Sequence, residues 1–289
     1  MVLDKHKLEF QLKISFIVFW FLFFLVNNSF ISAYLPLKKF EDHSVKKVLV
    51  KKVNIALLGG SNVLYGLSAH LISANFAPCI NLGLVQEMGA FAYYKDWLSN
   101  GFKARLVVYS PAILWSTASN FREVTSVKKV NFYFPSIISQ AKAGFILLFG
   151  SHSLYNEYGD GDEFVGGGLT DYFIDSTKFA HSTDSIVLAL ANRIKIIKDI
   201  SGSKFVLIRI PPVFAKSDVA KSLKQLMATR ISKLQSAGVT VVKTTIVTSD
   251  AELFNDNFHP SKHGIKHFTI ELIKELSSMK NLDFIHHFN

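Results

Sequence analysis

The sequence predicts an α/β fold, a three-layer α/β/α sandwich with a parallel sheet, preceded by an N-terminal transmembrane helix. Short apolar segments typical of buried strands alternate with longer segments of helical periodicity, as in βαβ units. Several of the apolar segments stop at glycine, serine or proline, which are residues that end strands. Residues 14–34 carry no charge and are mostly apolar. The first two observations predict the sandwich, and the third predicts the membrane helix.

The N-terminal third divides by composition. About 20 residues of helix cross a bilayer core, so the uncharged stretch is long enough to span one. Asn27, Asn28 and Ser29 interrupt it, which leaves a cleaved signal peptide as the alternative, although Phe30 and Ile31 suit a cleavage site poorly. We expect an N-terminal tail at residues 1–13, a transmembrane anchor or signal-anchor at 14–35 and a basic linker at 36–52. A catalytic domain would follow at 53–289, with an insertion at about 112–180.

The chain is basic, with 32 Lys and Arg against 22 Asp and Glu and a net charge of +10. No aromatic or groove-reading motif accompanies the charge, so we expect no nucleic-acid partner. Lysines concentrate directly after the predicted span, where they would contact anionic lipid headgroups. Their position favours a cytoplasmic domain, but long domains translocate despite such charge, so both sides of the membrane stay open. These lysines are Lys38, Lys39, Lys46, Lys47, Lys51 and Lys52.

The elements follow in order along the body of the chain. Apolar runs predict strands at 53–58, 79–82, 105–109, 204–210 and 239–243. Helical spacing predicts helices at 61–75, 85–100, 182–200, 217–236 and 261–280. Residues 112–180 fit no βα unit and hold several glycines, which indicates an insertion with a long loop. Within the insertion, segment 137–149 is apolar. This pattern is consistent with packing in the core, with lining a substrate groove and with lying at a membrane surface.

Two short segments carry the residues of a serine nucleophile. Ser61 follows Gly59 and Gly60 at the end of the first strand, and Asp256 and His259 lie three residues apart near the C-terminus. A histidine can take the proton from a serine hydroxyl, and a carboxylate on its second nitrogen fixes the tautomer. A strand-to-helix turn also exposes the serine N–H to an oxyanion. The alternatives are structural: Ser61 as a helix cap, Asp256 as a turn residue and His259 as a helix-start residue.

These segments resemble the motif blocks of the SGNH (GDSL-type) hydrolase superfamily over roughly residues 53–275, with the insertion at 112–180 unmatched. Gly59-Gly60-Ser61-Asn62 is similar to the nucleophile block, with glycine in place of its usual aspartate. Asn81-Leu82-Gly83 is similar to the second block, and Asp256-Asn257-Phe258-His259-Pro260 to the last. The third block, Gly-x-Asn-Asp after the third strand, is missing, since that strand ends Val107-Val108-Tyr109-Ser110-Pro111.

The resemblance implies the roles of the site residues. Ser61, Asp256 and His259 would be catalytic, and the N–H groups of Ser61 and Gly83 would bind the oxyanion. The asparagine of the third block would be a further oxyanion donor, and losing one such donor can cost roughly 100- to 1000-fold in rate. Asn62 and Asn120 are candidates to replace it and to bind substrate.

The resemblance also implies the function. We expect a serine esterase or O-acyltransferase, for acetyl groups, acting on a carbohydrate or cell-envelope polymer through an acyl-enzyme. The domain would be membrane-anchored and extracytoplasmic, with the bilayer, the acylated polymer and membrane assembly proteins as partners. The alternatives are a catalytically degenerate scaffold or carbohydrate-binding subunit, and a lipid esterase.

No cofactor or metal is expected. Cys79 is the only cysteine, which excludes an intrachain disulfide and a cysteine zinc site. His263 and His267 lie four apart on the last predicted helix, but no carboxylate motif completes a zinc site there.

Overall fold

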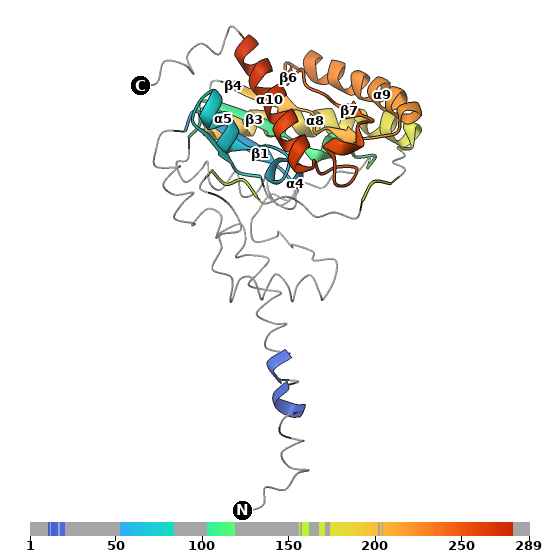
Figure 1. Ribbon diagram of the computed structural model, residues 1–289. Coiled ribbons are helices and arrows are strands. Elements are labelled where there is room, and N and C mark those ends of the chain that lie inside the picture. The colour runs from blue at the N-terminus through green and yellow to red at the C-terminus, as the bar shows by residue number, and fades with distance from the viewer. Residues whose placement is uncertain are drawn as a thin grey trace, which may run out of the picture.

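The structure is a computed structural model, and it describes a defined part of the chain. The described residues are 53–83, 103–118, 156, 158–161, 168–170, 174–201, 203 and 205–279, with 11, 13–16 and 18–20 near the N-terminus. Within them the protein has an α/β fold with a parallel sheet covered by helices on both faces, as predicted (Figure 1).

The central sheet has five parallel strands in the order β2-β1-β3-β4-β6. Each predicted strand is present to within one or two residues of its expected ends. The strands are β1 (Ile55–Gly59), β2 (Cys79–Asn81), β3 (Leu106–Ser110), β4 (Phe205–Arg209) and β6 (Thr240–Val242). Their residues are almost all buried, since both faces of the sheet are covered.

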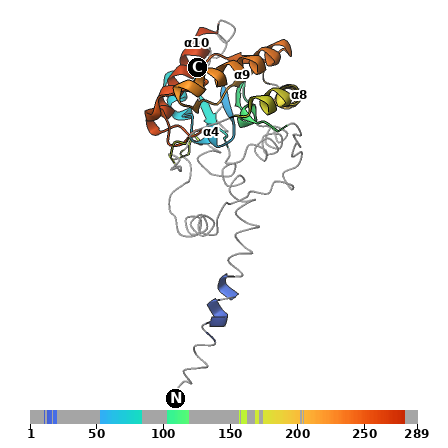
Figure 2. The same ribbon diagram turned by 90° about the vertical axis from the view of Figure 1, so that its right-hand side faces the viewer.

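Side chains alternate across β1 and so supply two separate cores. Ile55 and Leu57 face the helices α5 (Ala69–Asn75) and α10 (Lys262–Ser278). Ala56 and Leu58 face α8 (Ser176–Ser201) and α9 (Ser217–Ser236). Figure 2 shows α8 and α10 on opposite sides of the strands. The continuous apolar pattern of the strands is therefore what a sheet buried on both faces requires.

The strand order reverses direction beside β1. The chain runs from β1 outward to β2 and then returns to β3 on the other side of β1. Ligands of open parallel sheets bind beyond the carboxyl ends of the strands at such a reversal. The residues that end β1 and β3 there are Gly59 and Ser110, which are paired in register.

The predicted helix 61–75 is wrong in one respect, because it is two helices. The first, α4 (Ser61–Leu64), is a single turn, and α5 begins at Ala69. Ser68 caps α5, and its hydroxyl accepts a hydrogen bond from the Leu71 N–H at 3.2 Å. A serine in the middle of an apolar helical pattern competes for backbone donors in this way and starts a new helix.

Other boundaries also differ from the expectation. The helix predicted from Ser182 begins earlier, at Ser176, while α9 has the predicted bounds. The sequence did not predict the two-stranded parallel sheet of β5 (Val213–Phe214) and β7 (Val247–Thr248). Two 3-10 helices, η2 (Ala112–Trp115) and η4 (Ala251–Leu253), were also not predicted. The predicted helix 85–100 and the apolar segment 137–149 lie outside the described residues.

Among the described residues, no helix has both the length and the apolar character needed to cross a membrane. Of the predicted anchor, only residues 14–16 and 18–20 are described, and they are helical with exposed side chains.

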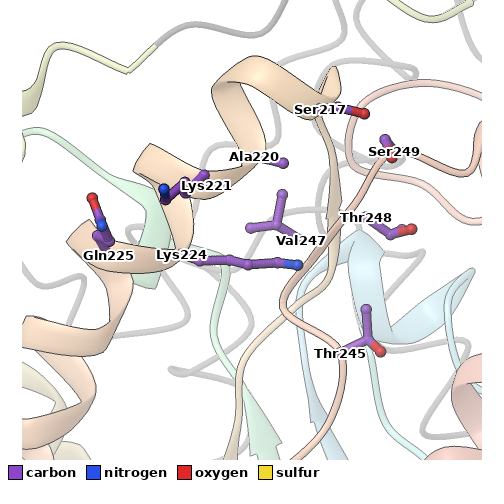
Figure 3. A pocket seen from close by; sticks show the side chains of 9 residues that line it. All are labelled: Ser217, Ala220, Lys221, Lys224, Gln225, Thr245, Val247, Thr248 and Ser249. Atoms are coloured by element: carbon purple, nitrogen blue, oxygen red, sulfur yellow. The ribbon is translucent and has the colours of Figure 1, made fainter.

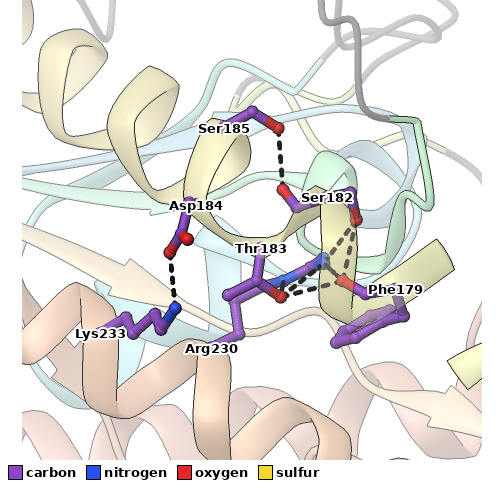
Figure 4. A network of polar contacts seen from close by, with 7 residues as sticks. All are labelled: Phe179, Ser182, Thr183, Asp184, Ser185, Arg230 and Lys233. Carbon is purple, nitrogen blue, oxygen red and sulfur yellow. Dashed lines mark hydrogen bonds and ion pairs between the residues drawn. The ribbon is translucent and has the colours of Figure 1, made fainter. Parts of the chain in front are cut away.

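Arg230 joins α9 to α8 and to η2 through a buried network (Figure 4). Its guanidinium donates to the carbonyls of Leu114 (2.6 Å), Ser116 (3.2 Å) and Phe179 (2.8 Å). It also donates to the hydroxyls of Ser182 (2.9 Å) and Thr183 (3.2 Å). The guanidinium carbon lies 3.5 Å from the centroid of the Phe179 ring. A charged group at 0 % exposure is tolerated here because its donors are satisfied.

Arg209, at the end of β4, is buried without such a network. None of its three side-chain nitrogens has a hydrogen-bond partner within the described part of the chain. Burial lowers the pKa of Arg209 to about 10, and the charge of Glu271 partly opposes this shift. The two arginines therefore differ in what they contribute to stability.

We predict that Arg230→Met and Arg209→Met have different effects on the free energy of unfolding. Arg230→Met removes the donor to the Leu114 carbonyl and one of the donors to the Ser116 and Phe179 carbonyls, and it breaks the bonds to two hydroxyls, so we expect a loss of about 3 kcal/mol. Arg209→Met breaks no side-chain hydrogen bond within the described part of the chain and removes a buried charge that Glu271 only partly offsets, so we expect a change within about 1 kcal/mol or a gain. Urea unfolding followed by circular dichroism measures both. Equal destabilisation by the two substitutions would contradict the difference.

Candidate active site

Ser61, His259 and Asp256 form a hydrogen-bonded chain, although Ser61 and His259 are 198 positions apart. His259 Nε2 lies 2.9 Å from Ser61 Oγ. On the other side of the ring, His259 Nδ1 lies 2.8 Å and 3.0 Å from the two carboxylate oxygens of Asp256. The His259 and Asp256 side chains are 16 % and 20 % exposed, so the group is partly shielded from water but reachable.

The turn that carries Asp256 orients its carboxylate. Asp256 Oδ1 accepts hydrogen bonds from the backbone N–H groups of Phe258 and His259, each at 2.8 Å. The carboxylate therefore holds its position when it also accepts from the imidazole. An acceptor at Nδ1 places the proton of neutral His259 on that nitrogen, which leaves Nε2 as an acceptor for the Ser61 hydroxyl.

Backbone contact explains the glycine two residues before Ser61. A Cβ on Gly59 would lie 2.3 Å from Val63 Cγ2 and 2.6 Å from the Ser110 carbonyl oxygen, so only glycine fits where β1 turns into α4. Gly60 is the N-cap of α4, and Ser61 is its first helical residue. The Ser61 hydroxyl is bonded to His259 instead of capping the helix, and the Ser61 N–H is in the first turn, where N–H groups have no intrahelical acceptor.

The His259 side chain also does not cap the helix that follows it. The N-cap of α10 is Ser261, whose hydroxyl accepts from the Gly264 N–H at 3.1 Å. His259 precedes that cap and contacts Ser61 and Asp256. The capping alternatives for Ser61 and His259 therefore do not describe their side chains.

Gly83, the second predicted oxyanion donor, lies against α4. A Cβ at this position would come within 2.4 Å of the Leu64 backbone nitrogen. However, the Gly83 N–H already donates to Asn81 Oδ1 at 2.9 Å. An oxyanion could use this N–H only by sharing it with, or displacing, the Asn81 carbonyl group.

Asn81 is itself held firmly. Its side-chain nitrogen donates to the carbonyls of Val63 (2.9 Å) and Leu67 (3.1 Å) and to Asp160 Oδ1 (3.1 Å). Asp160 also accepts from the Ala69 N–H at 2.7 Å and so binds the start of α5. These bonds explain why the Asn81 oxygen points at Gly83, and no local sequence pattern shows them.

The Asn62 amide nitrogen is committed to Ser110, while its side-chain oxygen is buried with no hydrogen-bond partner among the described residues. The side-chain nitrogen donates to the carbonyl (3.0 Å) and the hydroxyl (3.2 Å) of Ser110, and the residue is buried. The amide thus fastens α4 to the end of β3, and both of its N–H groups have acceptors. Asn120, the other candidate for the missing donor, lies outside the described residues.

Sequence reasoning missed two residues beside the triad. The ring of Tyr65 lies edge-on to His259, with 6.4 Å between centroids. Asn257 is buried and binds residues from elsewhere in the chain: its side-chain oxygen accepts from the N–H (3.0 Å) and hydroxyl (2.8 Å) of Thr170, and its nitrogen donates to the carbonyls of Thr170 and Phe214. Both contacts are tertiary, so spacing alone could not indicate them.

No group of three or more potential metal ligands occurs among the side chains that the structure describes. Of the histidine pair on α10, His267 Nε2 lies 3.7 Å from Glu271 Oε1.

Comparison with known proteins gives remote structural similarity only. No protein-family model matches the sequence, and no curated protein matches it. One similar solved structure is a carbohydrate esterase whose active site displays divergent catalytic and non-catalytic binding functions: 11% identity, TM-score 0.39, covering 80% of this chain and 70% of that one. Another is an acetyl xylan esterase from the rumen bacterium Butyrivibrio proteoclasticus: 11% identity, TM-score 0.32, covering 78% of this chain and 63% of that one.

We predict that Asn257 holds residues 168–170 beside the turn that carries Asp256 and His259 through its side-chain oxygen. Asn257→Ala removes the acceptor of the Thr170 N–H, so we expect its hydrogen exchange to speed up roughly tenfold or more and stability to fall by about 1–3 kcal/mol. Asn257→Asp keeps that oxygen, so the Thr170 amide should stay protected. Exchange measured residue by residue on the three proteins tests this. The same Thr170 exchange rate in all three would exclude the role.

Proposed function

We propose that the protein is a serine esterase or O-acyltransferase in which Ser61 is the nucleophile, His259 the general base and acid, and Asp256 the residue that orients His259. The observation that carries the proposal is the hydrogen-bonded chain from Ser61 Oγ through His259 to Asp256, with both contacts at 2.8–3.0 Å. This is the geometry that a serine nucleophile needs, because nucleophile and base must be within hydrogen-bond reach.

In the first step, Ser61 Oγ attacks the carbonyl carbon of the acyl group while its proton moves to His259 Nε2. The Asp256 carboxylate stabilises the imidazolium that forms. The tetrahedral intermediate carries a negative oxygen, which the Ser61 N–H at the start of α4 is placed to bind. Collapse of the intermediate breaks the bond to the leaving alcohol, which takes the proton from His259, and leaves an acyl group on Ser61.

In the second step, a hydroxyl attacks the acyl-enzyme. His259 Nε2 takes the proton of the attacking group and returns it to Ser61 Oγ, so that the enzyme is regenerated. Water as the attacking group gives hydrolysis, and a sugar hydroxyl gives transfer. The same three side chains serve both reactions, so access of water to the acyl-enzyme decides between them.

The substrate proposal rests on the resemblance to SGNH hydrolases in the blocks around Ser61, Gly83 and His259. We propose an acetylated carbohydrate or cell-envelope polymer as the substrate. Tyr65 supports an extended hydroxylated substrate, because an aromatic ring beside the reacting group gives a sugar ring an apolar face to pack on.

One observation favours a second candidate, a carbohydrate-binding subunit with a degenerate site. Among the described residues, Asn62 donates to Ser110 alone and the Gly83 N–H has an internal acceptor, so of the described candidates the Ser61 N–H is the oxyanion donor least committed elsewhere. A protein that binds the polymer without cleaving it would not need a second donor. The two candidates differ in whether Ser61 forms an acyl-enzyme.

Hydrolysis of an activated acetyl ester by the full chain tests the proposal. We expect turnover that falls by at least roughly 1000-fold in Ser61→Ala, because removal of the nucleophile leaves only oxyanion binding and positioning. Asp256→Asn should fall by about 10,000-fold if the carboxylate sets the tautomer of His259.

The control is Ser185→Ala, which removes a hydroxyl on α8 that donates only to the Ser182 carbonyl in its own helix. It should leave turnover unchanged. Folded Ser61→Ala protein with wild-type turnover would sink the esterase proposal. A folded wild type without turnover or acetyl adduct would support the binding subunit instead.

A further inference from the structure

A cavity lies between the first half of α9 and the segment around β7, and Ser61, Asp256 and His259 are not part of its lining (Figure 3). Its volume is about 600 Å³. Its polar lining consists mainly of two lysines of α9 and hydroxyl residues of both elements: Lys221, Lys224, Ser217, Thr245, Thr248 and Ser249. Neither the esterase proposal nor the motif blocks involve this cavity.

The cavity is positively charged. Lys221 and Lys224 lie about one turn apart on α9, and no aspartate or glutamate lines the cavity. Neither lysine forms an ion pair with any residue that the structure describes. In Figure 3 the Lys224 side chain extends from α9 towards the segment that carries Val247 and Thr248. The Lys221 side chain points in a different direction in Figure 3, and both lysines are exposed, so they raise the positive potential at the cavity without converging on one point. Exposed ammonium groups attract an oxyanion as point charges.

The hydroxyl groups add hydrogen-bonding capacity. Thr248 Oγ1 accepts from the Asp250 N–H at 3.1 Å, which leaves its own proton to donate. Thr245 differs, because its hydroxyl donates to Glu271 at 2.6 Å and can only accept from a ligand. Buried Val247 and Ala220 supply the apolar part of the lining. The combination suits a ligand that carries both an anionic group and hydroxyls on an aliphatic frame.

Hydrogen bonds connect the cavity wall to the catalytic turn. Thr248 is paired with Phe214 of β5, and its carbonyl accepts from the Ala215 N–H at 3.0 Å. The Phe214 N–H in turn donates to the carbonyl of Asn257, the residue after Asp256, at 3.0 Å. A single strand pair thus links the lysine cavity with the turn that holds the triad.

We propose that this cavity binds an oxyanion group, a carboxylate or a phosphate, of the polysaccharide on which the proposed esterase acts. The inference rests on the proposed function for the identity of the polymer. The cavity selects acidic over neutral polysaccharides by charge, and the triad removes or transfers the acyl group elsewhere on the same polymer.

Calorimetric titration of the full chain carrying Ser61→Ala tests the inference without turnover. The probes are oligogalacturonate for a carboxylate, glycerol phosphate oligomer for a phosphate, and xylo-oligosaccharide as the neutral counterpart. We expect one acidic probe to bind, with affinity that falls as salt rises and drops about tenfold or more on adding Lys221→Gln and Lys224→Gln. The acidic probe that binds identifies the group, and the neutral probe should not respond to the lysine substitutions.

The matched control adds Lys195→Gln and Lys198→Gln, an exposed lysine pair with the same spacing on α8. It removes the same charge and should leave binding unchanged. Equal weakening by both pairs, or no binding of either acidic probe, would overturn the inference. Turnover of the small activated ester by the chain with Ser61 intact distinguishes failure of the esterase proposal from failure of the cavity proposal. Lysine-dependent binding without turnover would support the cavity as a binding site and would contradict the esterase proposal.

Discussion

The two hydrogen bonds of the His259 ring are the interaction on which the candidate site depends. They join the turn after β1 to the turn before α10, which are the two ends of the described domain. The parallel sheet makes this meeting possible, because the carboxyl ends of its strands share one edge and Ser61 lies where the strand order reverses. Packing of α10 against α5 on the same face holds the second turn in place.

The site is complete on its nucleophilic side and sparse on its oxyanion side. Two side chains, His259 and Asp256, are in position to activate Ser61, and the backbone N–H groups of Phe258 and His259 hold the carboxylate. The polar groups on the other side of Ser61 are largely committed to one another: Asn62 to Ser110, and the Gly83 N–H to Asn81. An activated serine is consistent with acyl transfer, whereas the shortage of uncommitted oxyanion donors is consistent with a protein that binds the polymer without cleaving it.

Local patterns predicted the parts of the fold that depend on local forces. Apolar runs identified all five described strands of the central sheet, four of which stop at glycine or proline, and α9 was predicted with its observed bounds because its apolar face is regular. The helix break at Ser68 and the short strands β5 and β7 depend on tertiary hydrogen bonds, such as those of Asp160 and Asn257, that no spacing reveals. The same holds at the site. The Asp256–His259 spacing is readable in sequence, and the bond from the Gly83 N–H to Asn81 Oδ1 is a local turn, whereas the bonds that fix Asn81 to Val63 and Asp160 are not readable there.

Reaction of the folded full chain with a fluorophosphonate tests the central claim most directly. An activated serine oxygen displaces fluoride and forms a stable phosphonyl ester, so the modified residue can be located by peptide mass spectrometry. The account predicts a single adduct on the peptide that contains Ser61, and its loss in His259→Ala protein that is still folded. A folded wild-type protein that does not react, or that carries the adduct on another residue, would contradict it.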